Sequence, residues 1–348
     1  MGKLFGTDGV RGVAGKDLTC ELALQIGRGT AAVLTSLDGH RPKILIGKDT
    51  RVSGDMLEST LAAGLCSVGA DVELLGVIPT PGVAYLVRKY NADAGIMISA
   101  SHNPMEFNGI KIFKGDGYKL PDEVENQIEA HVFNNCTDIR LAEGADIGRI
   151  KMCRTGVKDY VDFLQEHIDA DLTGLKVLFD CANGASARVA QELFPRLGCE
   201  CGFIGTQQDG VSVNDGCGST HLEELGKRVR EGCYDVGIAF DGDADRLGVV
   251  TRSGNIIYPD RQMMLFAEDI LKHHPGAQII YDVKCTRALV PWIRGRGGVP
   301  TISATGHSLV KARLRETGAP FAGEMSGHLF FNDGRWPGFD DGLYAAAR

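Results

Sequence analysis

The sequence predicts an α/β protein of three consecutive domains, each with a mixed sheet sandwiched by helices. The first observation is length, because 348 residues are too many for one ordinary hydrophobic core. The second is a repeated pattern, in which a short apolar run ends in a polar loop and an amphipathic segment follows. Strand, loop and helix in this order form the βαβ unit, which builds parallel or mixed sheets.

The repeated pattern begins with strand-like runs at Lys43, Lys176 and Gln278. After the first run, residues 56–68 have the pattern of a helix and residues 72–77 that of a second strand. A helix is expected to residue 197 after the second run, and a helix through Trp292 after the third. Each copy therefore supplies a strand with a helix to cover it.

The spacing of the copies gives domains 1–150, 151–250 and 251–348. In such folds ligands collect beyond the carboxyl ends of the strands, so the loops that follow the apolar runs are the candidates for function. Residues 341–348 have the pattern of the first turns of a helix, without a glycine or proline to end it. We therefore expect the chain to be a truncated form of a longer protein.

The composition limits the classes of function. The net charge is −8 and the Lys and Arg residues are spread along the chain, which argues against a nucleic-acid-binding protein. No apolar run approaches the ~20 residues that cross a bilayer, so no membrane segment is expected. The ten cysteines lack the paired spacing of a zinc site, and Cys199 and Cys201 alternate along a strand-like run. We expect reduced core thiols and a cytoplasmic protein.

The first candidate loop is Ser-Ala-Ser-His-Asn-Pro at residues 99–104, directly after the apolar run 94–98. A tight turn closed by Asn-Pro presents Ser101 at the end of a strand. A serine hydroxyl can carry a group covalently when a neighbour activates it, and Lys111 is a candidate base on the following run. The G-x-S-x-G frame of serine hydrolases is missing, and an ordinary turn remains the alternative.

The second candidate loop carries Asp241, Asp243 and Asp245 after another apolar run. Three carboxylates at alternate positions can converge on one cation, and oxygen ligands favour Mg²⁺ or Ca²⁺. An EF-hand is excluded because Arg246 and Arg252 stand where its glycine and glutamate would be. A solvated acidic turn and a phosphatase with Asp241 as nucleophile remain alternatives, although the third carboxylate weighs against the phosphatase.

The third candidate loop is Gly-Glu-Met-Ser-Gly-His at residues 323–328. Its carboxylate, hydroxyl and imidazole can bracket neighbouring sugar hydroxyls with acceptors and donors, although a polar turn would have the same composition. Cationic side chains in other loops can together neutralise a phosphate. They are Arg11, Arg51, Lys284, Arg287 and His307.

Together these loops resemble the α-D-phosphohexomutase family, and the likeness covers the whole chain. The phosphoserine loop of the family matches residues 99–104, its metal loop 241–246 and its sugar-recognition loop 323–328. A fourth motif, Gly-Thr-Asp-Gly-Val-Arg at residues 6–11, matches near the amino terminus. The resemblance implies a magnesium enzyme that moves a phosphoryl group between the 1- and 6-positions of a hexose.

The resemblance also implies roles for the matching residues. Phosphorylated Ser101, charged by an activator of the glucose 1,6-bisphosphate type, donates its phosphoryl group to a sugar monophosphate. Lys111 and His307 form the proton-transfer pair, and Arg246 steadies the phosphoserine. The implied Mg²⁺ ligands are Ser101, Asp241, Asp243 and Asp245. The implied substrate contacts are Arg11, Arg51, His102, Lys284, Arg287, Glu324, Ser326 and His328.

Two departures from the family matter. Members carry a fourth, carboxyl-terminal domain with a phosphate-binding loop, and this sequence stops before it, so a fragment with weak or no activity is an alternative. Residues 1–245 resemble phosphoglucosamine mutase, whereas residues 247–348 resemble bacterial phosphomannomutase/phosphoglucomutase, with Met325 in place of a usual glutamine. The sugar loop lies in the later part, so mannose or glucose phosphate is expected over glucosamine phosphate. The expected partners are sugar phosphates, and both a monomer and a homodimer remain open.

Overall fold

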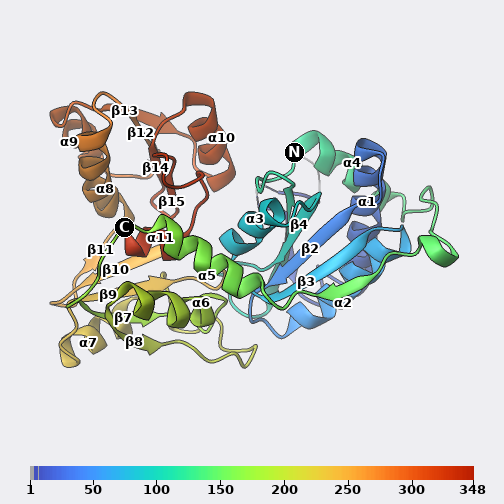
Figure 1. Cartoon of the computed structure of the whole chain (residues 1–348), viewed down its shortest axis with the longest axis horizontal. Coiled ribbons are helices and arrows are strands. Elements are labelled where there is room, and N and C mark those ends of the chain that lie inside the picture. Colours follow the sequence, from blue (N-terminus) through green and yellow to red (C-terminus); the bar gives the residue numbers. More distant parts are fainter. Residues whose placement is uncertain (1–3, 7) are drawn as a thin grey trace. The chain divides into compact units, whose positions relative to one another are not determined.

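The computed structural model describes residues 4–6 and 8–348, and these residues form three sheets (Figure 1). The chain divides into two compact units. The first extends to Val161 and includes Gln207–Asp215, and the second comprises Asp162–Thr206 and Gly216–Arg348. The segment Gln207–Asp215 belongs with the first unit because its backbone is bonded there, with Val52 N donating to Gly210 O at 2.9 Å.

The first unit is built on one mixed sheet. Its elements are β1 (Val10–Val13), α1 (Cys20–Asp38), β2 (Lys43–Lys48), α2 (Ser53–Ser67), β3 (Asp71–Val77), α3 (Thr80–Lys89), β4 (Ala94–Ile98), β5 (Phe107–Lys114), α4 (Asp122–Phe133), the 3₁₀ turn Gly144–Asp146 and β6 (Ile150–Met152). The strand order is β1-β5-β4-β2-β3-β6. Strand β2 is parallel to β3 and β4, whereas β5 is antiparallel to both β4 and β1.

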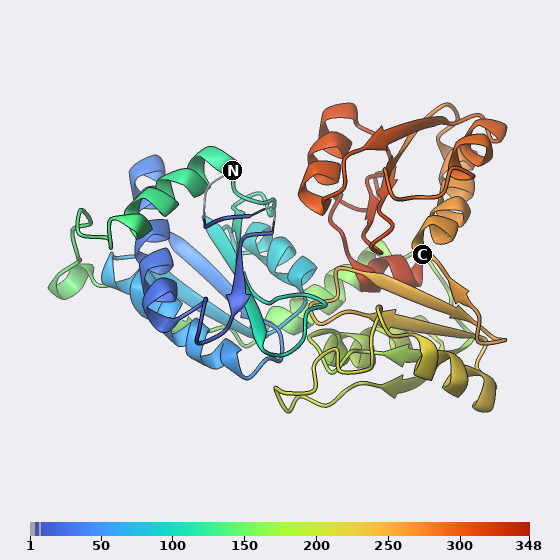
Figure 2. The ribbon, with the colours of Figure 1, turned by 180° about the vertical axis from the view of Figure 1, so that it is seen from behind.

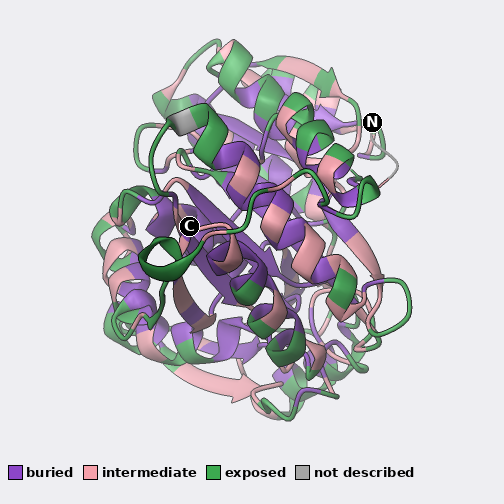
Figure 3. Ribbon diagram, turned by 90° about the vertical axis from the view of Figure 1, so that its right-hand side faces the viewer, coloured by how far each residue is buried: buried purple, intermediate pink, exposed green. Residues whose placement is uncertain are grey.

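Successive side chains of β2 point to opposite faces of the sheet, and the residues between its two ends are all buried. The first sheet therefore buries both of its faces. Ile44 and Ile46 enter the core that the strands share with α1, α2 and α4. On the opposite face lie Leu45 and Gly47, and a Cβ on Gly47 would come within 2.6 Å of Val83 Cγ2 in α3. Figure 3 shows the consequence, with buried residues on the strands and exposed residues on the outer sides of helices.

The second unit contains two sheets, and helix α5 (Gly156–His167) contains the division between the units. The elements of its first sheet region are β7 (Lys176–Asp180), α6 (Ser186–Leu193), the 3₁₀ turn Phe194–Leu197, β8 (Glu200–Ile204), α7 (Glu223–Glu231), β9 (Val236–Phe240), β10 (Leu247–Thr251) and β11 (Ile256–Ile257). Those of its second sheet region are α8 (Pro259–His273), β12 (Gln278–Asp282), α9 (Leu289–Gly295), β13 (Val299–Ser303), α10 (His307–Thr317), β14 (Phe321–Gly323) and β15 (Leu329–Phe331). Helix α11 (Gly342–Ala347) follows in the chain and packs against β9 and β10 of the first sheet region.

Each sheet of the second unit has its own core. One sheet has the strand order β11-β10-β9-β7-β8, and in its core the ring of Phe179 stacks on that of Phe194 with centroids 4.1 Å apart. The other sheet has the strand order β13-β12-β14-β15, and its residues Ile280 and Phe330 pack with Val310 of α10. Figure 2 shows α10 on one side of this sheet and α8 with α9 on the other. Both sheets mix parallel and antiparallel pairs.

The predicted α/β architecture with mixed sheets and covering helices is confirmed. The helix predicted over 56–68 is α2, which begins earlier, at Ser53. The helix predicted to residue 197 ends at Leu193 and continues as a 3₁₀ turn, because Pro195 has no N–H to extend the α-helix. The last residues form α11, as predicted, with Asp341 Oδ1 accepting from Tyr344 N at 3.0 Å.

The cysteine prediction holds only in part. The ten cysteines are free, and several of them are buried, among them Cys181 and Cys199. Cys233, however, is exposed. Within the described stretch of the chain, none of the helices combines the length and the apolar character needed to cross a membrane.

Candidate active-site loops

The serine loop follows β4 and holds Ser101 in a strained conformation. Ser101 has φ of +54°, which is rare for a residue other than glycine, and the residue is only 1% exposed. Its backbone N–H donates to Ser99 Oγ at 2.9 Å, and Ser99 Oγ donates to Asp49 Oδ2 at 2.6 Å. Backbone strain that the surroundings hold in place is typical of functional sites.

Arg51 holds the serine loop in place through hydrogen bonds to its backbone. Its side chain and that of Asp49 are both fully buried, and Nε donates to Asp49 Oδ2 at 2.9 Å. The terminal nitrogens donate to four carbonyl oxygens of the loop and its flank, those of Ser101, Asn103, Pro104 and Phe107. These contacts use the five N–H donors of a guanidinium. A substrate contact by Arg51, predicted from the sequence, would compete with these bonds.

Asn214 braces the same loop from the segment Gln207–Asp215. Its Nδ2 donates to Ser101 O at 2.8 Å and to Asn103 O at 3.1 Å. Asn214 was not predicted as a site residue, because nothing in its local sequence indicates a partner more than a hundred residues away. The residue explains why this segment belongs to the first unit.

The remaining predicted residues of the first unit lie on the strands beside the serine loop. Lys111 is buried on β5 and pairs in register with Met97 of β4, so it shares the hairpin that carries Ser101. His102 Nδ1 lies 3.5 Å from Ser101 Oγ. Arg11 on β1 donates to Asp8 Oδ2 at 2.9 Å. Of the amino-terminal motif at residues 6–11, Thr7 lies outside the described residues.

The metal loop joins β9 to β10 and brings three buried carboxylates together. Asp241, Asp243 and Asp245 are at most 2% exposed, and each offers an oxygen within 4.8 Å of the others. Arg246 follows them in the loop, and its Nε lies 3.8 Å from Asp241 and 4.0 Å from Asp245. Three converging carboxylates offer oxygen ligands only, and this donor set fits a hard divalent cation such as Mg²⁺.

A close backbone approach shapes the metal loop. Gly242 O accepts from Ala185 N at 2.8 Å, in the loop that follows β7. A Cβ on Gly184 would lie 2.5 Å from Gly242 O, so only glycine fits there. At the next bend Ala244 has φ of +59°. The loop after β7 therefore supports the turn that aims the three carboxylates.

The sugar loop lies against the metal loop within the second unit. Leu247 N donates to Gly327 O at 3.1 Å, and Arg246 Nε donates to His328 Nε2 at 3.1 Å. Glu324 is buried, and its Oε1 accepts from Gly306 N at 2.6 Å. The sequence placed these two loops eighty residues apart, and the fold makes them neighbours.

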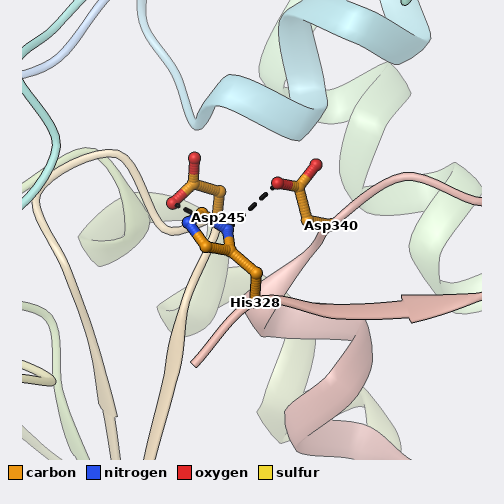
Figure 4. A group of neighbouring side chains, drawn as sticks. All are labelled: Asp245, His328 and Asp340. Carbon is orange, nitrogen blue, oxygen red and sulfur yellow. Dashed lines mark ion pairs between the residues drawn. The ribbon is translucent and has the colours of Figure 1, made fainter. Parts of the chain in front are cut away.

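Asp340 is a buried residue beside the sugar loop that the sequence analysis missed. Figure 4 shows it with His328 and Asp245, and its Oδ2 lies 3.0 Å from His328 Nδ1. The predicted residue His307 begins α10 and stacks its ring on that of His328, with centroids 5.1 Å apart. A buried carboxylate has no sequence signal of its own, so Asp340 was not predicted. Lys284 and Arg287 are exposed on the loop after β12, and Ser326 lies in the sugar loop.

Comparison with known proteins identifies the family of the chain. Three family profiles match consecutive parts of the chain: phosphoglucomutase/phosphomannomutase alpha/beta/alpha domain I over residues 2–138, domain II over 158–254 and domain III over 258–348. A phosphoglucosamine mutase from Acetivibrio thermocellus is 48% identical, across 100% of this chain and 78% of its own length. One from Clostridium novyi is 46% identical, across 99% and 76%.

A solved structure agrees in fold. A phosphoglucomutase/phosphomannomutase family protein from Burkholderia thailandensis superposes with a TM-score of 0.87 at 40% sequence identity. The superposition covers 99% of this chain and 75% of that chain. The chain thus spans about three quarters of the length of the proteins that it resembles.

Proposed function

The chain belongs to the phosphoglucomutase/phosphomannomutase family and is a phosphohexomutase, and we propose that Ser101 carries its phosphoryl group and that glucosamine phosphate is its substrate. The observation that carries the first proposal is the buried, left-handed backbone of Ser101, braced by Arg51 and Asn214. An ordinary turn has no need of such support. The relatives do not favour a phosphatase or an inactive fragment.

The proposed reaction moves one phosphoryl group at a time. The bond between Ser101 Oγ and phosphorus breaks as a bond forms from a sugar hydroxyl oxygen to the same phosphorus. The hydroxyl proton passes to His307, and Lys111 supplies the proton that Ser101 Oγ takes up. The resulting sugar bisphosphate returns its other phosphoryl group to Ser101, with the protons moving back. A sugar bisphosphate from solution would phosphorylate Ser101 at the start.

Asp241, Asp243 and Asp245 are the proposed Mg²⁺ ligands, with an oxygen of the phosphorylated Ser101 as a further one. When bound, the cation offsets the negative charge of the transferred phosphoryl group. Arg246 sits beside the same carboxylates and adds a positive charge. Glu324 and Ser326 are the proposed partners of the sugar hydroxyls, and the remaining contacts fall to Arg11, His102, Lys284, Arg287 and His328.

The sugar assignment changes the expectation from the sequence. The later part of the chain favoured mannose or glucose phosphate on the basis of a few residues such as Met325. The two relatives named above are both phosphoglucosamine mutases, and their similarity extends across 99–100% of the chain, the sugar loop included. Similarity of this extent supports glucosamine phosphate more strongly than one loop position supports another hexose.

A coupled turnover assay tests the proposal. The purified chain is given Mg²⁺, a trace of the matching bisphosphate, and glucosamine, glucose or mannose phosphate in separate reactions. We expect turnover with the highest kcat/KM on glucosamine phosphate. A higher value on mannose or glucose phosphate would overturn the sugar assignment and leave the mutase assignment in place.

Replacement of the carrier tests the role of Ser101. Ser101→Ala should abolish turnover, whereas Ser59→Ala, at an exposed serine on α2, should behave as the wild type. Peptide mapping should find phosphate on Ser101 of the wild type after incubation with the bisphosphate. Retained mutase turnover in Ser101→Ala would refute the carrier, and phosphate release without turnover would indicate a phosphatase with Asp241 as nucleophile.

A further inference from the structure

Cys199 and Cys201 place two thiols side by side at one edge of a sheet in the second unit. Their Sγ atoms lie 2.9 Å apart, and both cysteines are free. Cys201 belongs to β8, the edge strand next to β7 (Figure 1), and the pair lies at the amino end of this strand. Strands β8, β7 and β9 are parallel, so the metal loop after β9 lies at the opposite end of the sheet. The two thiols are therefore separate from the proposed active site.

The backbone before β8 explains why the two sulfurs meet. Gly198, with φ of +91°, ends the 3₁₀ turn Phe194–Leu197, and the chain then enters the strand. Side chains two positions apart along an extended strand point to the same face of the sheet. Cys199 Sγ also donates to Phe194 O at 3.5 Å, and Cys201 Sγ donates to Cys199 O at 3.4 Å. The turn and the strand together hold both thiols on one face.

The pair is partly accessible, and both thiols carry their protons near neutral pH. Cys199 is 7% exposed and Cys201 is half-buried. Burial raises the pKa of the Cys199 thiol, and burial together with the neighbouring Cys199 sulfur raises the pKa of Cys201 to about 12. Because the thiolate is the reactive form of cysteine, neither residue is a fast nucleophile. A ligand that takes up the two thiol protons as it binds suits this pair.

The geometry argues against a disulfide bond and against zinc. Residues two apart on a strand with a rise of about 3.3 Å have Cα atoms about 6.6 Å apart, near the upper limit for a disulfide. Tetrahedral zinc has four ligands, and bonds of about 2.3 Å would hold two sulfurs about 3.8 Å apart. Within residues 4–6 and 8–348, the groups of three or more potential metal ligands do not include either cysteine. The pair therefore fits a ligand that needs two sulfurs close together.

We propose that Cys199 and Cys201 form a binding site for a trivalent arsenical, which takes both sulfurs at once. Trivalent arsenic is a soft, thiol-seeking centre, and soft centres prefer sulfur ligands. It is also pyramidal, with bond angles near a right angle, so it bridges sulfurs that lie closer together than those around a tetrahedral ion. This site is additional to the mutase function and does not rest on it.

Binding is a condensation between the arsenical and the two thiols. An organoarsenic oxide, R–As=O, reacts so that both S–H bonds break and two As–S bonds form. The oxygen leaves as water with the two thiol protons. Arsenic stays trivalent and neither sulfur is oxidised, so the step needs no oxidant or reductant. Both thiols enter the reaction in the protonated form that they have near neutral pH.

Binding through two sulfurs distinguishes this pair from a single cysteine. Once the first As–S bond has formed, the second thiol lies beside the arsenic, and the second bond forms within one molecule. Linked binding of this kind strengthens affinity by about 10²–10⁴-fold over a single contact. Cys233, which is exposed after α7, offers one sulfur for comparison.

Titration with phenylarsine oxide tests the site. The full chain is reduced with a phosphine, which adds no competing thiol, and is then followed by intact-mass spectrometry and peptide mapping. We expect the first phenylarsenic group to map to residues 199–201. Cys199→Ser and Cys201→Ser should each raise the concentration for half-occupancy by about 10²–10⁴-fold. Cys233→Ser is the matched control and should bind as the wild type does.

Two results would overturn the inference. One is an unchanged half-occupancy concentration in either serine variant of the pair, because one sulfur would then suffice. The other is loss of the group from the wild-type chain in excess glutathione, a monothiol, since a chelate should be released only by a dithiol. The glutathione challenge needs no variant, so it decides the matter even if a substitution prevents folding. Both readouts are masses and not turnover, so they stand apart from any failure of the proposed function.

Discussion

Replacing Arg51 should weaken the first unit severely, and the size of the effect follows from its contacts. Arg51 and Asp49 are both fully buried, and the guanidinium is the partner of that carboxylate. Arg51→Ala removes the guanidinium from the buried Asp49, which keeps the hydrogen bond from Ser99 Oγ. Breaking a buried ion pair by removing one partner costs about 3–5 kcal/mol. Most domains have only about 5–15 kcal/mol of stability, so this loss is a large share.

Arg51→Lys is the milder form of the same perturbation. A lysine keeps the positive charge beside Asp49 but has three donors in place of five. At least one of the loop carbonyls, such as the part-buried carbonyl of Phe107, then loses its bond from residue 51, and a lost hydrogen bond of this kind costs about 0.5–1.5 kcal/mol. The carbonyls of Ser101 and Asn103 keep Asn214. We therefore expect an order of stability of wild type, then Arg51→Lys, then Arg51→Ala.

Urea unfolding with two probes measures where the stability is lost. Both tryptophans, Trp292 and Trp336, lie in the second unit, so their fluorescence reports on that unit, whereas far-UV circular dichroism reports on both. With a slope of about 1–3 kcal/mol per molar urea, the loss of about 3–5 kcal/mol should lower the dichroism midpoint of Arg51→Ala by about 1–5 M. The fluorescence midpoint should stay near that of the wild type. An unchanged dichroism midpoint, or an equal fall in both, would refute the reasoning.

Three further predictions concern the second unit. Asp243→Asn should raise the Mg²⁺ concentration for half-maximal activity by about tenfold or more, since it removes a charged ligand, and unchanged Mg²⁺ activation would count against the site. Gly184→Ala should lower the urea midpoint, because a Cβ would lie 2.5 Å from Gly242 O and the crowding costs about 1–3 kcal/mol; full stability would show that the two loops can separate freely. Burial raises the pKa of the Cys181 thiol to about 12, so the unfolded chain loses this proton near pH 9 and the folded chain does not. Stability should therefore fall as the pH rises above about 9, less steeply in Cys181→Ala, and alkylation at pH 8 should label exposed Cys233 but not Cys181; early labelling of Cys181 would contradict the burial.

The sequence predicted the parts of the site that are encoded locally. Apolar runs followed by polar loops identified where strands end, and the serine, metal and sugar loops all lie there. The charged loop at 241–246 was recognisable because alternating carboxylates have few structural uses. These features need only short stretches of sequence, which is why pattern and composition suffice to find them.

Residues whose partners are distant in sequence were harder to predict. Arg51 looked like a phosphate-binding residue, because its charge is visible in the sequence but the carbonyls it contacts, 50–56 residues away, are not. Asp340 gave no signal for the same reason, since its partners come from two other parts of the chain: Lys311 and His307 from α10, and His328 from the sugar loop. Which distant residues meet depends on the order of the strands in the sheets, and a local sequence pattern does not reveal that order.

Three buried aspartates indicate that the support of these loops follows a rule. Asp49 directly follows β2, Asp180 ends β7 and Asp282 ends β12, and each of these strands lies within its sheet between parallel neighbours. The three carboxylates accept bonds from an adjoining loop: from Ser99 in the serine loop, from Gly218 N, and from Met325 N in the sugar loop. Parallel strands end at one edge of a sheet, so a carboxylate at one strand end reaches the loop beside it. The fold therefore repeats one device, an acceptor fixed on a rigid strand, to hold loops that carry most of the chemistry.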